Sequence, residues 1–115
     1  GGVAGRVAAG RVVEVAIPEG VLGVPVLNVT AVGPSGAGHV TVFPCDRSVP
    51  VASNLNYGVG ETVANLVMVR PDASGRVCVL SHAEVDLVVD LAGSVATGAT
   101  PLDSPVRITD TRRLP

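Results

Sequence analysis

Apolar and polar residues alternate along several short stretches of this chain. In the stretch 85–91, every second residue is a valine or a leucine, whereas Asp86 and Asp90 lie between them. The stretch 11–17 repeats this pattern, with Glu14 opposite its apolar face. A period of two residues is typical of a β-strand that buries one face. The pattern therefore predicts strands rather than amphipathic helices.

Glycine, proline and small polar residues separate the apolar stretches and mark turns between them. The run 33–38, GPSGAG, is expected to form the loop of a hairpin. The run 72–75 is expected to form a turn whose glycine adopts a positive φ. About eight short strands at this spacing are typical of an all-β sandwich, with a small β-barrel as the alternative. The predicted strands are 11–17, 26–32, 39–43, 53–57, 63–70, 76–80, 85–91 and 106–109.

The composition supports a single all-β domain. The chain has 115 residues, of which 25 are valine, and the branched valine side chain favours an extended backbone. We expect one β-sandwich domain over residues 1–115, with the small-residue segment 92–104 as a linker. The segment 105–112 is expected to be a terminal strand that pairs either within its own chain or with a neighbouring copy.

Charge and hydropathy argue against nucleic-acid binding and a membrane span. The formal net charge is −2, and the eight basic residues are all arginines scattered along the chain. Such scattering provides no basic patch for nucleic acid. The most apolar stretch, 85–95, is too short to cross a bilayer and contains two aspartates. The first ten residues lack the apolar core of a signal peptide, so an exported form is expected to have lost its signal or to belong to a longer parent.

Cys45 and Cys78 are the two cysteines of the chain, and each lies at or near the end of a predicted strand. We predict a disulfide between them, and therefore an oxidising compartment, either secreted or at the cell surface. The alternative is a zinc site, because His39 precedes Cys45 by six residues and His82 follows Cys78 by four. The extended context and the lack of a C-x-x-C pair make zinc the weaker alternative.

No group of residues predicts catalysis. A nucleophilic triad would need Ser81, His82 and either Asp86 or Asp90, but neighbouring residues of a strand point to opposite faces. A G-x-S-x-G elbow is absent from the sequence. Glu84 and the two aspartates are expected to form the solvated face of a strand, since EF-hand spacing is also absent. We expect no cofactor.

Two further sets of polar residues are expected to have structural roles. Asn54, Asn56 and Asn65 are expected to satisfy backbone groups at irregular points of the strands. Asp110 and Arg112 are two residues apart, so they share a face if that segment is extended. A local ion pair is the simpler interpretation, and docking to a neighbouring module is the alternative.

Four segments of the chain, in order, resemble a known family. They are LNVTAVGPSGAGHVTVFPC at 27–45, ASNLNYGVGETVANLVMV at 52–69, GRVCVLSHAEVDLVVDLAG at 75–93 and PVRITDTR at 105–112. They are similar to the motifs of a β-domain found in secreted and cell-surface actinobacterial proteins. In that family an R-L-L-D-T-R motif opens the unit, whereas here the similar segment stands at the end.

The resemblance implies an accessory module, either beside cell-wall hydrolases or in tandem arrays, without a catalytic site. We therefore expect a non-catalytic module for structure, adhesion or assembly, whose partners are neighbouring domains or copies joined through strand pairing. A cell-wall glycan-binding module is the first alternative, although Phe43 and Tyr57 are the only aromatic residues that could stack on sugar rings. A hydrolase is the more distant alternative.

Overall fold

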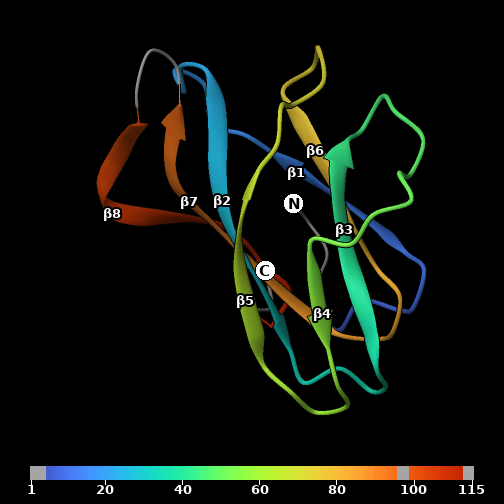
Figure 1. The fold of residues 1–115 in the computed structure, drawn as a ribbon. Helices are drawn as coiled ribbons and strands as arrows, with labels where there is room; N and C mark the ends of the chain where they lie inside the picture. The colour runs from blue at the N-terminus through green and yellow to red at the C-terminus, as the bar shows by residue number, and fades with distance from the viewer. Residues whose placement is uncertain (1–4, 96–98, 113–115) are drawn as a thin grey trace.

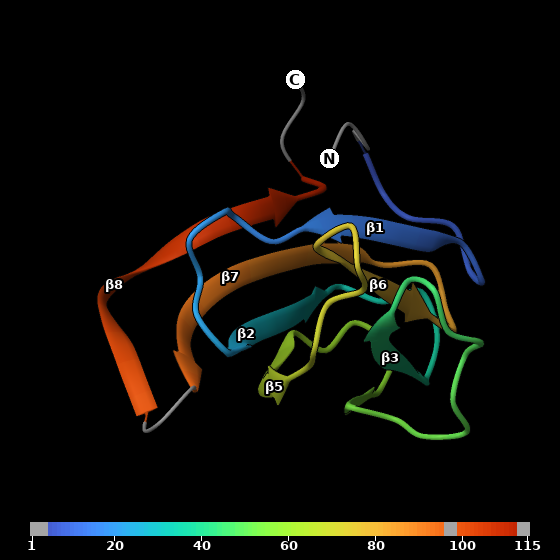
Figure 2. The same cartoon turned by 90° about the horizontal axis from the view of Figure 1, so that it is seen from above.

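The structure is a computed structural model that describes residues 5–95 and 99–112, with the backbone alone for residues 99–105. Within these ranges the chain forms eight strands and no helix. The strands make two four-stranded sheets that pack face to face as a sandwich and are not closed into a barrel (Figures 1 and 2). The predicted all-β sandwich is therefore confirmed.

Both sheets are antiparallel throughout. The first has the order β1-β6-β3-β4 and the second the order β5-β2-β7-β8. The bounds are β1 Val12–Ala16, β2 Val24–Val32, β3 Gly38–Pro44, β4 Leu55–Tyr57, β5 Val63–Met68, β6 Arg76–Ser81, β7 Asp86–Val95 and β8 Ala99–Asp110.

The core lies between the sheets and consists mainly of valine and leucine. In β2 and β7 every second residue is buried, and the fully buried Val29 and Val89 are paired in register. The first sheet contributes Val77 and Val79 from β6 to the same cluster. Complete burial of one such side chain stabilises the fold by roughly 1.5–3 kcal/mol. The predicted inward face of the strand that begins near Val85 is confirmed, since all four of its apolar positions are buried.

The predicted hairpin at residues 33–38 is wrong. The strands on either side of this loop, β2 and β3, belong to different sheets and are not paired. The loop instead carries the chain across the sandwich, and the N–H of Ser35 donates to the Glu84 carbonyl at 2.9 Å. Turn residues indicate where a chain reverses, but the packing of both strands decides which sheet it enters next.

The expected linker over residues 92–104 is also wrong where the structure describes it. Residues 92–95 continue β7, and residues 99–104 begin β8. The two strands pair antiparallel here, with Gly93 opposite Pro101 and Val95 opposite Ala99. Small side chains do not prevent backbone pairing, so composition alone could not distinguish a linker from a β-ribbon.

Two of the asparagines satisfy backbone groups through their side chains, as predicted. The Asn54 side-chain oxygen accepts a hydrogen bond from the N–H of Val42 at 2.7 Å, in β3. The Asn65 side-chain nitrogen donates to the Asn54 carbonyl at 2.8 Å, which links β5 of the second sheet to the first. Asn56 is exposed on β4, and its role stays a prediction.

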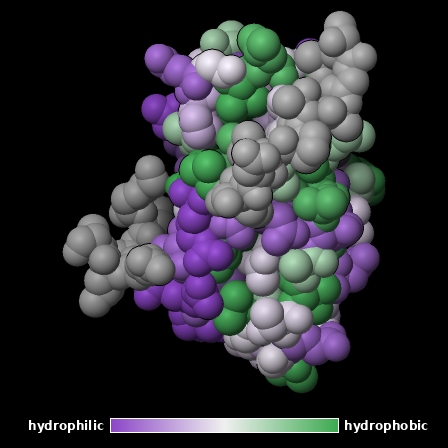
Figure 3. Space-filling model, turned by 90° about the vertical axis from the view of Figure 1, so that its left-hand side faces the viewer, coloured by the Kyte–Doolittle hydropathy of each residue, from purple (hydrophilic) through white to green (hydrophobic). Residues whose placement is uncertain are grey.

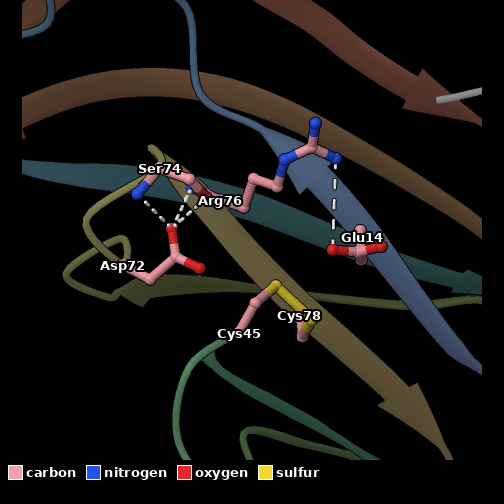
Figure 4. Close-up of a disulfide and its surroundings, with 6 residues drawn as sticks. All are labelled: Glu14, Cys45, Asp72, Ser74, Arg76 and Cys78. Atoms are coloured by element: carbon pink, nitrogen blue, oxygen red, sulfur yellow. Dashed lines mark hydrogen bonds and ion pairs between the residues drawn. A yellow bond between two sulfur atoms is a disulfide. The ribbon is translucent and has the colours of Figure 1, made fainter.

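The predicted disulfide between Cys45 and Cys78 is present and joins the end of β3 to β6, with 5.0 Å between the Cα atoms (Figure 4). The turn at residues 72–75 lies nearby in the same view, and its Gly75 has a φ of 79° as predicted. One carboxylate oxygen of Asp72 accepts hydrogen bonds from the backbone N–H groups of Ser74 and Arg76, both at 2.9 Å. The hydrogen bond from the Ser74 hydroxyl is the largest cause that lowers the pKa of Asp72 below its usual value.

Candidate functional site at the junction of the chain ends

The first and last described segments of the chain lie against each other. The N–H of Gly5 donates to the carbonyl of Thr111 at 2.9 Å, and Val7 exchanges backbone hydrogen bonds with Val85 at 2.8 and 3.1 Å. Figure 2 shows the N-terminal segment running towards the end of β8. We call this region, made of segments 5–7, 84–87 and 110–112, the terminal junction.

Thr111 is the buried centre of the terminal junction. Its side chain is fully buried, and its hydroxyl accepts a hydrogen bond from the N–H of Leu87 at 2.8 Å. The same hydroxyl donates to the Asp86 carboxylate at 3.1 Å. Its backbone N–H donates to the Leu87 carbonyl at 3.0 Å, and its carbonyl accepts from Gly5. Thr111 therefore fastens the end of β8 to both β7 and the N-terminal segment.

Arg6 forms the polar cover of the same region. Its guanidinium donates to the Glu84 carboxylate at 2.9 Å, to the Asp86 carboxylate at 3.1 Å and to the Gly33 carbonyl at 2.6 Å. The hydrogen bond to Glu84 is the main cause that raises the pKa of Arg6. The Arg6 side chain is 38% exposed, so each ion pair alone adds little to stability. The arrangement acts mainly through its geometry, because one rigid planar guanidinium joins the N-terminal segment to residues 84–86 and to Gly33.

Two more arginines bind acidic residues along the end of β8. Arg107 donates to the Asp90 carboxylate on β7 at 2.8 Å. Arg112 donates to Asp110 through its guanidinium at 3.0 Å and through its backbone N–H at 3.1 Å. The side-chain hydrogen bond from Arg112 is the main cause that lowers the pKa of Asp110 to about 2.

The structure contains the local ion pair expected between Asp110 and Arg112, and docking through them stays a prediction. Arg107 and Arg112 are both nearly half exposed on the β8 side of the molecule, and their charges are balanced by the carboxylates that they bind. Figure 3 views the molecule from that side and shows hydrophilic side chains gathered in one broad patch.

The sequence alone did not reveal the parts played by Arg6, Thr111 and Arg107. Arg6 is 78 residues from Glu84, and Thr111 is 24 residues from Leu87, so no local spacing connects these pairs. The one available signal was the resemblance of segment 105–112 to a family motif. The resemblance drew attention to the segment but did not reveal the role of Thr111.

The residues of the zinc alternative do not form one cluster. The sulfur atoms of Cys45 and Cys78 are bonded to each other, so neither is a thiolate ligand. His39 and His82 stack on one another with ring centroids 5.0 Å apart, where β3 begins, whereas Cys45 follows the end of that strand. In the described ranges, the one group of potential metal ligands is the cysteine pair with Glu14. With both sulfurs in a disulfide, this group offers one carboxylate.

Ser81 is placed for structure rather than for nucleophilic attack. It is fully buried, and its hydroxyl lies 2.7 Å from the Tyr57 hydroxyl and donates to the Ala83 carbonyl at 2.9 Å. The Tyr57 oxygen accepts from the N–H of Ala83 at 3.0 Å. His82 is exposed, and its ring stacks on that of His39. Ser81, Tyr57 and Ala83 form a closed ring of hydrogen bonds, which a substrate would have to break to reach the Ser81 hydroxyl.

The remaining candidate residues also have structural partners. Ion pairs with arginine side chains involve Glu84, Asp86 and Asp90, and these pairs hold separate segments of the chain together. Phe43 and Tyr57, the two aromatic residues, are each 5% exposed and offer no open ring face to a sugar.

The fold and the terminal junction define a disulfide-linked β-sandwich whose first and last described segments are hydrogen-bonded to each other. No helix among the described residues is long and apolar enough to cross a membrane. No family model matches the sequence, and no curated protein or solved structure matches the chain.

Proposed function

We propose that this domain is a non-catalytic module for structure, adhesion or assembly in a secreted or cell-surface bacterial protein. The observation that supports this proposal is the way β8 is held. β8 forms one edge of its sheet and pairs with a single neighbour, β7, in two stretches, at residues 99–101 and 106–110. Its end is then locked by the buried Thr111.

A strand held in this way completes the sheet whether it comes from the same chain or from another copy. Thr111 contacts Leu87 and Gly5 through backbone hydrogen bonds and one hydroxyl hydrogen bond. These contacts require only that the strand reaches the edge of β7. Pairing within one chain is favoured by the short connection over residues 96–98. In a tandem array, the same strand supplied by a neighbouring unit would link copies without a separate ligand.

The surface location is supported by two observations. A disulfide between strands is typical of proteins that fold in oxidising compartments. The four motifs at 27–45, 52–69, 75–93 and 105–112 resemble a domain of actinobacterial surface proteins, which agrees with such a compartment.

The test is strand complementation. Deleting residues 99–115 should lower the melting temperature, because it exposes the edge of β7 and leaves Leu87 without its partner. A synthetic peptide of residues 99–115 added to the shortened protein should bind and restore the melting temperature. The matched control is the same peptide with Thr111→Val, which should restore it less.

The proposal would be overturned by a shortened protein that keeps the melting temperature and solution size of the full chain and binds no peptide. A pull-down of the full chain on purified peptidoglycan checks the rival function. Retention that soluble glycan competes away would replace the assembly role with glycan binding.

A further inference from the structure

The β5 edge differs from the other sheet edges of this molecule. Within the described part of the chain, β5 pairs with β2 on one side and with no strand on the other. Its sequence, VANLVM, contains no charged residue and no proline. Natural sheet edges usually carry such residues because an unguarded edge pairs with strands of other chains.

The other three edges are guarded in recognisable ways. β1 carries Glu14 in its centre, and β4 is only three residues long. β8 contains two prolines at 101 and 105, together with Asp103, Arg107 and Asp110. The missing guard on β5 is therefore particular to this strand and is not a general feature of the sandwich.

The hydrogen-bond pattern shows which backbone groups of β5 face outward. Just beyond the strand, the N–H of Val69 donates to the Pro25 carbonyl on β2. Because backbone groups alternate sides along a strand, the N–H groups of Ala64, Leu66 and Met68 point away from β2. The N–H of Leu66 agrees with this assignment, since it donates instead to the side-chain oxygen of Asn65 at 3.0 Å.

The side chains of these same residues make an apolar ridge beside the edge. Leu66 is 60% exposed and Met68 is 66% exposed, and Ala64 lies on the same face of the strand. Their partners on β2 are Val26 opposite Met68 and Asn28 opposite Leu66. The edge therefore offers outward hydrogen-bonding groups and apolar area together.

We infer that the β5 edge binds the β5 strand of a second copy of this chain, antiparallel and about a two-fold axis at Leu66. This register places Leu66 opposite Leu66 of the second copy and Ala64 opposite Met68, a small residue against a large one. All three outward-facing residues then pair with outward-facing residues. The pairing joins two four-stranded sheets into one sheet of eight strands across the dimer.

A second copy suits this edge for a specific reason. The edge has no charge with which to select a different partner, whereas a two-fold arrangement needs only that the strand matches itself. The inference extends the proposed assembly role to a second edge and does not depend on whether β8 pairs within its own chain.

Asn65 sets the strength of this pairing. Its side-chain oxygen accepts a hydrogen bond from the N–H of Leu66, and its side-chain nitrogen donates to the Asn54 carbonyl at 2.8 Å. The bond to Leu66 must open before a second strand can bind there. The change Asn65→Ala removes this competition in both copies of the dimer and should tighten dimerisation by about thirtyfold, the effect of two ordinary hydrogen bonds.

Sedimentation equilibrium of the full chain over a concentration series tests the inference. The native protein should shift from monomer to dimer, and Leu66→Lys should remain monomeric because two ammonium groups would meet at the axis. Leu22→Lys is the matched control, since Leu22 is an exposed leucine in a loop outside β5, and it should dimerise like the native protein. Met68→Lys serves as a second edge variant if the thermal melt shows that Leu66→Lys does not fold.

Amide hydrogen exchange followed by NMR locates the contact. The N–H groups of Ala64, Leu66 and Met68 should gain protection with concentration, whereas that of Val67 should not change. A native protein and an Asn65→Ala variant that are both monomeric throughout would overturn the inference, as would a dimer that persists in both lysine variants of the edge. Neither result affects complementation by the β8 peptide, so failure here is distinct from failure of the proposed function.

Discussion

Thr111 and Leu87 hydrogen-bond to each other twice. The N–H of Thr111 donates to the Leu87 carbonyl at 3.0 Å, and the N–H of Leu87 donates to the Thr111 hydroxyl at 2.8 Å. The second bond extends the pairing of β7 and β8 past the last ladder residue through a side chain. Thr111, one residue beyond the end of β8, is thereby fully buried.

Replacing Thr111 by valine should destabilise the domain by about 1–3 kcal/mol, because the shape is kept but the buried N–H of Leu87 loses its acceptor. Urea unfolding measures this change. Thr111→Ser keeps the hydroxyl and should retain most of the stability. Equal stability of the valine and native proteins would show that the hydrogen bond between Leu87 and the Thr111 hydroxyl does not stabilise the fold.

The stability contributed by Asp110 should depend on pH at the acidic end. Its pKa is lowered from 3.8 to about 2, so its ionised form favours the folded state. This contribution is complete above about pH 4 and is lost as the pH falls towards 2. The difference in unfolding free energy between the native protein and Asp110→Asn should therefore shrink over that range.

The variant Arg112→Gln tests the cause of the lowered pKa of Asp110. Since hydrogen bonds from Arg112 are the main reason for the lowered pKa, this variant should lose most of the same acid-dependent stability. A difference between native and Asp110→Asn proteins that stays constant from pH 5 to pH 2 would contradict the assignment.

Changing Tyr57 to phenylalanine should cost about 1–3 kcal/mol, although one oxygen atom is all that is removed. The buried ring loses its bond to Ser81 and leaves the N–H of Ala83 without its acceptor. Chemical denaturation measures the free energy of unfolding of this variant. The control is Ser53→Ala on an exposed loop, whose free energy of unfolding should stay within about 0.5 kcal/mol of that of the native protein. A neutral Tyr57→Phe variant would mean that water replaces the hydroxyl at no cost.

The disulfide should stabilise the domain by about 3–4 kcal/mol, as expected for a bridge that closes a loop of this length. Intact mass before and after reduction and alkylation shows whether Cys45 and Cys78 are oxidised. The variant with both cysteines changed to serine should unfold at lower urea concentration. Two free thiols in the purified native protein would contradict the bridge and return zinc to consideration.

The approximate positions of the eight strands and the buried face of the strand around Val89 were readable from the chain itself. Alternation around Val89 has a period of two residues, and that period survives in any sheet that buries one face. The turn at Gly75 was readable for the same kind of reason, since its positive φ is a local property of one residue. The placement of Cys45 and Cys78 near strand ends was enough to predict their bridge.

The tertiary structure decided where these strands go and what their polar residues do. The loop at 33–38 crosses between sheets instead of closing a hairpin, because the choice depends on packing across the whole core. Arg6, Glu84 and Thr111 meet although they are far apart in sequence, and no local pattern encodes such a meeting. Local backbone preference acts over a few residues, and so the sequence alone determined most of the elements, although it did not predict that residues 92–95 and 99–104 are in strands. The fastening of the chain ends rests on contacts between distant segments, which exist only once both sheets have packed.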